Sequence, residues 1–449
     1  MRQNLLETYS RQLKIAEAYV AKNFDGKAIS NNTQLATAVL LDNTNRWLTE
    51  SMTTGLAGTN RTDLGDWKKF CLNLTNIAVP SLIANDLVIV HPMTSYSGSV
   101  AYLKYVALTD KNGMQGKELN SVFGLGTMDE NRMNYTSQIV VENGTTPALT
   151  VKKDGISYFA ENGVDVKYAD IKAIDANGKA TYVTCTRDDK GTVTATNVPA
   201  GTARIAYVSE EFQMAATPAK NIPTIGPKME RIPLVAEPRR IAVKYDQITA
   251  FQAKTDYGFS LDKQIAEQAC GELAYEIDTE IVDMLYKAAF GHDDEEMLTW
   301  SKRLPVGVSK FEHYNGFLEV IEEAKMIIYN RTKKFHPNYM VIAADVLPVL
   351  KFVNGFTAAK NAKMNGPYKV GEIDGLDVYV SPALDAGDFF LGLNGSDMMS
   401  SAGVYAPYMA IVPTQLLGTP DGGLAQGFST WYAKAILNDN LLVAGKITK

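Results

Sequence analysis

The chain has 449 residues, of which 46% are apolar and 21% charged, values typical of a folded protein long enough for two or three domains. Its formal net charge of −6 argues against a protein that grips phosphate backbones through a basic stripe, but not against one that merely encloses nucleic acid. Three scattered cysteines show no disulfide or zinc spacing, which favours small buried hydrophobes, and neither a secretory signal nor a run of ~18 apolar residues is present. We therefore expect a soluble protein made in the cytoplasm.

The first 75 residues form a predicted helical arm. Leu5, Tyr9, Leu13 and Val20 recur at three- and four-residue spacing, and a second helix is expected from about Thr33 to Ser51. Neither helix has an obvious partner of its own, so this region resembles an arm more than a domain.

Two extended segments follow the arm. Leu87 to Val90 are four apolar residues in a row, which predicts a buried strand within residues 80–93. Val100 to Leu108 predicts another strand, and Asn112-Gly113 is a turn signal. The whole segment is therefore expected to be long and hairpin-like.

Residues 141–208 have a different composition. Pairs such as Asn143-Gly144 and Asn162-Gly163 punctuate short alternating runs, and turn signals every ~8–12 residues favour a small all-β sandwich. Proline-rich extended chain resumes after it, which indicates an inserted domain.

The longest regular pattern lies between Ser260 and Ala289 and predicts one long helix. Its apolar ladder consists of Leu261, Ile265, Ala269, Leu273, Ile277, Ile281 and Leu285. Its acidic face consists of Asp262, Glu267, Glu272, Glu276, Asp278, Glu280 and Asp283. Gly271 costs about 1 kcal/mol inside a helix relative to alanine, which predicts a bend or a close crossing there.

Mixed α and β elements complete the chain. Phe311 to Thr332 predicts an amphipathic helix, and residues 338–347 predict a buried strand that runs into a helix. Further strands are expected within residues 375–384 and, with a turn, 389–399. After them, two or three strands surround a glycine-rich loop. Helices and strands are therefore mixed in this half of the chain, as in an α+β fold.

Catalytic signatures are missing from the sequence. It contains no GxSxG, no phosphate loop, no HExxH and no complete dinucleotide fingerprint. The four histidines, His91, His292, His313 and His336, are scattered, and the run "HDDEE" from His292 is best explained as solvated charge. We expect no enzyme, no cofactor and no metal.

Several stretches carry a family resemblance. "RRIAVKYD", "FFLGLNGSDMMSSAGVYAPYMAIV", "GFSTWYAKAIL" and "IAVPSLIANDLVIVHPMTSYSGSVAYLKYVA" occur in an order similar to that of tailed-bacteriophage major capsid proteins with the Hong Kong 97-type fold. The likeness is to the contractile-tailed, large-phage branch, which carries an inserted β domain. It covers about residues 76–449 without the insert.

This resemblance implies a division of the chain. The implied parts are an N-terminal arm (1–75), a peripheral domain (76–93, 238–306 and 401–449) with a spine helix at about 260–289, an extended loop (94–140 and 209–237), an inserted β domain (141–208) and an axial domain (307–400). Its last strands would complete the peripheral sheet.

The resemblance also implies a function. The chain would self-assemble into hexamers and pentamers of an icosahedral shell around double-stranded DNA, in the virion, with portal and scaffolding proteins and a decoration protein as further candidate partners. Residues proposed for contacts between subunits are Lys104, Lys111, Lys117, Glu118, Arg132, Glu272, Glu276, Glu280, Tyr405 and Tyr408. The acidic helix face is either solvated or meets basic loop residues of a neighbour.

Alternatives remain at this level. Some relatives cross-link lysine to asparagine, for which Lys111, Lys117, Asn438 and Asn440 are the candidates here. An encapsulin-type nanocompartment shell shares the fold. A carbohydrate-binding surface protein could use aromatics of the β insert, namely Tyr158, Phe159, Tyr168, Tyr182 and Tyr207.

Overall fold

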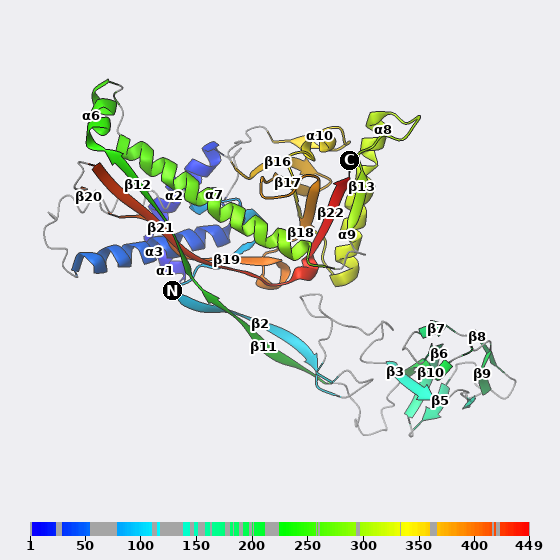
Figure 1. Cartoon of the computed structure of the whole chain (residues 1–449). Coiled ribbons are helices and arrows are strands. Elements are labelled where there is room, and N and C mark those ends of the chain that lie inside the picture. The colour runs from blue at the N-terminus through cyan, green and yellow to red at the C-terminus, as the bar shows by residue number, and fades with distance from the viewer. Residues whose placement is uncertain are drawn as a thin grey trace. The chain divides into compact units, whose positions relative to one another are not determined.

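A computed structural model gives the architecture of the chain (Figure 1). It describes residues 2–23, 29–53, 79–109, 115–116, 138–143, 148–150, 158–161, 164–175, 180–182, 184–187, 192–196, 200, 202–211, 224–256, 258, 261–292, 297–332, 334–359, 366–414, 417–418 and 423–448. The fold is mixed α+β, as predicted. It divides into two compact units: Met1–Tyr102, Val122–Gly124 and Arg231–Lys449 form unit 1, and Leu103–Ser121 and Leu125–Glu230 form unit 2.

Unit 2 contains only strands and turns among its described residues. One antiparallel sheet has the order β3-β10-β6-β5, with β7 paired to β6, and a second has the order β4-β9-β8. The strands are β3 Gln138–Asn143, β4 Ala148–Thr150, β5 Tyr158–Glu161, β6 Val164–Asp175, β7 Ala180–Tyr182, β8 Thr184–Arg187, β9 Thr192–Thr196 and β10 Thr202–Glu211.

A two-stranded ribbon is formed by β2 Ser97–Ala107 and β11 Ile225–Val235. Two hydrogen bonds extend the pairing just beyond the end of β2 and the start of β11. The backbone N–H of Leu108 donates to the carbonyl oxygen of Thr224 (2.9 Å), and the hydroxyls of Thr109 and Thr224 lie 2.8 Å apart. The strand predicted from Val100 to Leu108 is β2.

In unit 1, four strands form a sheet in the order β1-β19-β21-β12, and β20 pairs with β21. They are β1 Ile89–Val90, β12 Glu237–Asp246, β19 Gly403–Pro413, β20 Leu417–Gly418 and β21 Gly423–Ile436. Side chains alternate between the two faces of a strand, so each face has its own covering. The long helix α7 Leu261–Ala289 covers one face, where Leu273 packs with Ile411 and Phe428. On the other face, Val404 and Ala433 pack with residues of the ribbon base.

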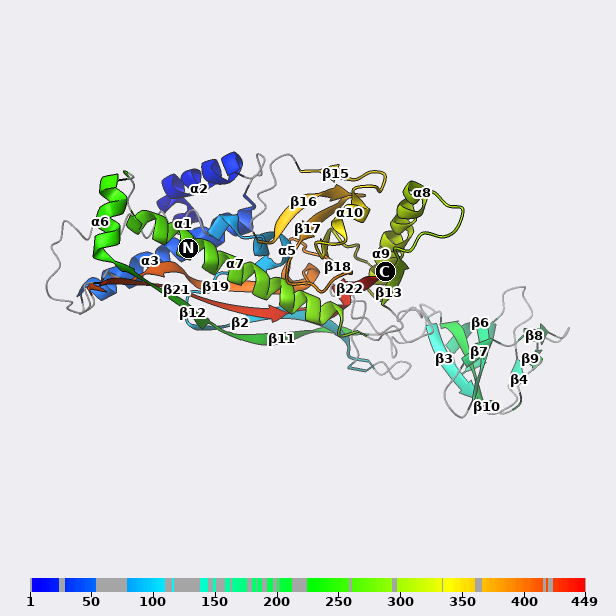
Figure 2. The same ribbon diagram turned by 45° about the horizontal axis from the view of Figure 1, so that its top comes forward.

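The predicted long helix is confirmed as α7 (Figure 2). Ile277, Ile281 and Leu285 are at most 2% exposed, so the apolar ladder faces the core as its spacing required. Of the two predictions at Gly271, a bend or a close crossing, the crossing is wrong among the described residues, because a Cβ added there would meet no atom within 4 Å. The bend remains a prediction. Cys270 is buried beside this ladder, as expected, and burial raises the pKa of its thiol to about 12.

A second sheet of unit 1 has seven strands in the order β13-β22-β18-β14-β17-β16-β15. They are β13 Leu298–Ser301, β14 Tyr339–Ile342, β15 Thr357–Ala358, β16 Tyr368–Ile373, β17 Leu376–Val380, β18 Asp388–Gly392 and β22 Leu442–Thr448. The last strand, β22, lies here between β13 and β18 and not beside β21, where the sequence had placed it. Leu442 to Ala444 are all buried, as a central strand with both faces covered requires.

The helices associated with this sheet are α8 Lys310–Asn315, α9 Phe317–Thr332 and the short α10 Leu347–Leu350. The single helix expected from Phe311 to Thr332 is therefore two helices, separated at Gly316. The chain also contains α6 Gln247–Asp256 before α7, and single turns η3 Met398–Ser400 and η4 Asp439–Leu441.

The strand predicted within residues 80–93 is mostly not a strand. The chain forms η1 Val79–Ser81, then α5 Ala84–Leu87, and only Ile89–Val90 pair as β1. Leu87 and Val88 are fully buried as predicted, but a buried apolar run does not distinguish a strand from a short helix.

The N-terminal helices are α1 Arg2–Thr8, α2 Ser10–Asn23 and α3 Asn31–Thr53. The expectation that they lack a partner is wrong for α3, which packs against β19. The Asn43 amide nitrogen donates to the carbonyl oxygens of Met93 and Tyr408, both at 2.8 Å, and Leu40 packs with Val79 and Ala410. Within the described residues, no helix is both long and apolar enough to cross a membrane.

Replacing Asn43 by alanine is expected to destabilise the subunit by about 1–3 kcal/mol, because one buried and one partly buried carbonyl oxygen lose their donor. Chemical unfolding of unassembled subunits measures this. The exposed Asn32 on the same helix is the matched control, and its alanine variant should change the free energy of unfolding by less than ~0.5 kcal/mol. Equal effects of the two changes would contradict the packing of α3 on the sheet.

Candidate assembly surfaces

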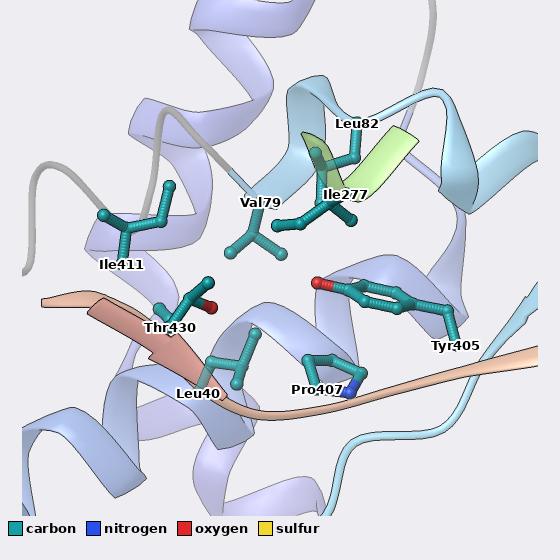
Figure 3. Close-up of a pocket in the computed structure, with 9 residues that line it drawn as sticks. Leu40, Val79, Leu82, Ile277, Tyr405, Pro407, Ile411 and Thr430 are labelled. Carbon is teal, nitrogen blue, oxygen red and sulfur yellow. The ribbon is translucent and has the colours of Figure 1, made fainter. Parts of the chain in front are cut away.

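A small pocket between α3, α7 and the β19–β21 pair is too small for a substrate (Figure 3). The cavity has about 10 Å³, room for about one water molecule. Its lining is Leu40, Val79, Leu82, Ile277, Tyr405, Pro407, Ala410, Ile411 and Thr430. Nothing in this lining offers a nucleophile beside a base, so the cavity is a packing defect of the core.

Three of the four histidines contact other residues of the fold through their rings. His292 Nε2 lies 2.9 Å from the carbonyl oxygen of Asp439, and His313 Nε2 lies 2.9 Å from that of Ser301. His336 stacks on the ring of Tyr329. Among the described residues no three histidine, cysteine or acidic side chains come together as a metal site. Residues 293–296 of the "HDDEE" run lie outside the described part.

The ribbon carries a series of exposed apolar side chains. In unit 2, Tyr105, Leu108, Ile225 and Met229 are 45–57% exposed, and Tyr96 and Val235 at the base in unit 1 are similarly exposed. A two-stranded ribbon is marginal in water by itself, and gathered apolar side chains on a surface mark a protein contact. The ribbon is therefore a candidate assembly surface.

An ionic network anchors the chain that leaves this ribbon. Glu280 of α7 accepts from Arg239 Nε at 2.8 Å, from Arg239 Nη2 at 3.0 Å and from Lys434 Nζ at 3.0 Å. The Tyr432 hydroxyl donates to the same carboxylate at 2.8 Å. Burial opposes ionisation of Glu280, but these four donors outweigh it and lower its pKa to about 2. The network connects β12 and β21 to helix α7.

The prediction for Asp278 was wrong. It was assigned to the acidic face, yet it is buried, and its carboxylate accepts from the backbone N–H of Ala84 at 2.9 Å. Burial raises its pKa to about 7, against hydrogen bonds from the Ala84 and Ile83 backbones. Helical spacing could have found it, because Val282, four residues later, belongs to the same core-facing side.

The residues predicted to contact neighbouring subunits differ in their exposure, and some of them lie outside the described residues. Glu272 and Glu276 are exposed on α7, and Tyr408 is half-buried. Tyr405 is only 2% exposed, and Glu280 accepts hydrogen bonds from Arg239 while its side chain stays 31% exposed. Their contacts with a neighbour remain predictions. Lys104 lies in β2, and its side chain is not described. The remaining four, Lys111, Lys117, Glu118 and Arg132, lie outside the described residues.

The cross-linking candidates are likewise only partly described. Asn438 is buried, and its side-chain oxygen accepts from the Asn440 backbone N–H at 3.1 Å, which fits a turn-capping role at η4. Both candidate lysines lie outside the described part.

The chain was compared with known proteins. A family model described as major capsid protein Gp23 matches residues 64–447. The major capsid protein of Escherichia phage AR1 is 23% identical over 393 residues, 81% of this chain and 74% of the relative. That of the contractile-tailed Enterobacteria phage T4 is 23% identical over 399 residues, again 81% and 74%.

Solved structures from phages and from an encapsulin are also similar. A chain from Microbacterium phage Oxtober96 is 12% identical with a TM-score of 0.41, covering 82% of this chain and 91% of that one. The holo-SrpI encapsulin complex from Synechococcus elongatus PCC 7942 gives 9% identity and a TM-score of 0.34, over 50% and 77%. Because the Gp23 model spans most of the chain, we conclude that this chain belongs to the Gp23 family and is a major capsid protein of a tailed bacteriophage.

Proposed function

We propose that this capsid protein has the Hong Kong 97-type fold and that its ribbon is an extended loop that lies on a neighbouring subunit. In this assignment α7 is the spine of a peripheral domain, the seven-stranded sheet is the core of an axial domain, and residues 141–208 are an inserted domain. The encapsulin and carbohydrate-binding alternatives are displaced by the family to which the chain belongs.

The observation that carries the proposal is the exposed apolar surface of the ribbon. Ile225 and Met229 are each 57% exposed and four residues apart, so their side chains leave β11 on the same side. Contact with a second copy would remove this apolar surface from water. Each such contact can be weak, since a closed shell multiplies it many-fold.

The assembly that follows is an icosahedral shell of hexamers and pentamers. It would enclose double-stranded DNA without binding its sequence, consistent with the net charge of −6. Portal and scaffolding proteins would be its partners during assembly, with a decoration protein as a further candidate. Synthesis would take place in the cytoplasm of the bacterial host.

Negative-stain electron microscopy of the purified protein, alone and from infected cells, tests the proposal. Hexamers, pentamers or icosahedral shells are expected. Monodisperse monomers in both samples would exclude it.

Replacing Ile225 and Met229 by threonine is expected to reduce shell formation at least tenfold while leaving the subunit folded. Threonine suits a strand, and both side chains are more than half exposed to solvent. Shell yield by sedimentation is the measurement. Ile15→Thr on α2, at a side chain 47% exposed, is the control and should assemble normally. Normal yield from the double variant would contradict the role of the ribbon.

A further inference from the structure

The segment between β13 and α8 presents an apolar side chain at an exposed turn. The Val308 backbone N–H lies 3.4 Å from the Pro305 carbonyl oxygen, and Gly307 has φ +89°, as the third residue of a type II turn requires. Val306 occupies the second position and is fully exposed (106%), and Leu304 and Phe311 on either side are also exposed. We call residues 302–311 the knob; Figures 1 and 2 show this segment projecting beside α8.

The base of the knob is firmly held. The Ser309 hydroxyl accepts from the Glu312 backbone N–H at 3.2 Å and so caps α8. The Lys302 backbone N–H donates to the carbonyl oxygen of Thr448 in β22 at 2.8 Å. Trp300, just before the knob, stacks on His313 with ring centroids 4.9 Å apart. A held turn loses little conformational entropy when it binds a partner.

Cations surround this apolar turn. Arg303, Lys310 and Lys351 are exposed, and none of their side chains forms an ion pair with a described residue. Lys310 Nζ instead lies 5.3 Å from the ring centroids of both Tyr314 and Phe352, and Phe352 is itself 46% exposed. Glu312 is the acidic side chain nearest in sequence, so the surface is basic but not exclusively so.

The outer face of α9 has the complementary character. Glu319, Glu323 and Met326 are spaced four and three residues apart and are exposed on the same side of the helix. Tyr329 adds a further exposed aromatic ring at 40%. Glu322 is paired with Lys325, whereas Glu319 and Glu323 form no ion pair among the described residues. This face is therefore apolar and acidic.

We propose that the knob of one copy packs against the outer face of α9 in a neighbouring copy. The inference rests on the proposed function, since it requires copies of the chain to meet in a shell. A closed ring of identical subunits needs two different patches that fit each other, because each subunit contacts the next head to tail. Knob against knob would oppose cations, and α9 against α9 would oppose carboxylates, whereas knob against α9 pairs opposite charges and apolar side chains.

Charge reversal within one chain tests the contact. The knob variant carries Arg303→Glu and Lys310→Glu, the helix variant carries Glu319→Lys and Glu323→Lys, and a third protein carries all four changes. Each double variant is expected to lower shell yield at least tenfold at moderate salt. The quadruple variant is expected to recover most of the wild-type yield, because opposite charges face each other again.

The experiment distinguishes failure of the proposed contact from failure of the proposed function. Impaired double variants without rescue, or double variants that assemble like wild type, would overturn the contact while wild-type shells still support the proposed function. Wild-type protein that forms no shell would contradict both. Thermal unfolding of unassembled subunits checks the fold of each variant. If a charge variant fails to fold, Val306→Asp replaces it, since that side chain is fully exposed; Val306→Asp that assembles normally overturns the proposal.

Discussion

Replacing Glu280 by glutamine is expected to destabilise the unassembled subunit by about 2–3 kcal/mol, because two partly buried cations would lose their common anion. The expected loss of stability is smaller than for a fully buried ion pair, because the Glu280 side chain is 31% exposed and solvent screens it. Chemical unfolding followed by circular dichroism measures the change. Glu276 lies four residues earlier on α7, is exposed and forms no ion pair with a described residue, so Glu276→Gln is the matched control.

The same network predicts an acid dependence. Glu280 has its pKa lowered from 4.5 to about 2, so its contribution to stability is complete above pH 4.5 and is lost as the pH falls towards 2. The wild type should therefore lose stability relative to Glu280→Gln across this window. A constant difference between the two proteins from pH 5 to pH 2.5 would contradict the ionised network.

How far the sequence predicted this molecule depends on the range of the interactions. The 29-residue helix α7 followed from a ladder of apolar residues, and periodicity of this length leaves little choice of structure. The strand predicted within the segment from Val79 to Val90 was mostly wrong, because four consecutive apolar residues suit a buried helix as well as a buried strand. Its helical turn depends on an acceptor supplied by Asp278, 194 residues away in the chain.

The placement of β22 failed for a related reason. Its apolar residues specify a central strand, but not which of two sheets it enters. The choice depends on η4 Asp439–Leu441, where the chain turns after β21, and on the pairing of Phe390 with Ala444 in β18 and β22. Neither a turn direction nor a partner strand is encoded in local periodicity.

The contact residues were the least predictable from sequence. Charge on α7 was assigned to one solvated or subunit-facing surface, yet it serves three purposes. Asp278 accepts from the first backbone N–H of α5, Glu280 holds two strands, and Glu276 is exposed to solvent. The knob was not predicted at all, because an exposed valine in a turn is visible only once burial is known.

Asp278 gives the strongest expected pH dependence near neutrality. Its pKa is raised from 3.8 to about 7 by burial, so the folded subunit holds a proton that the unfolded chain has released. Its contribution is most favourable below pH 3.8 and declines as the pH rises towards 7. The nearby charge of Asp86 in α5 raises the pKa further, whereas hydrogen bonds from the Ala84 and Ile83 backbones oppose the shift.

The Asp278→Asn variant should lack this decline, because its amide does not ionise while its oxygen can still accept from Ala84. Between pH 5 and 8 the free energy of unfolding of the variant should rise relative to wild type by about 2–3 kcal/mol. The absolute difference at one pH also contains the cost of a buried amide, so the change with pH is the quantity to measure. Parallel curves for the two proteins would mean that Asp278 is ionised throughout. Curves that approach each other towards pH 8 from a less stable variant, or that move apart in the variant's favour, would show that Asp278 of α7 carries a neutral carboxyl where it meets Ala84 of α5.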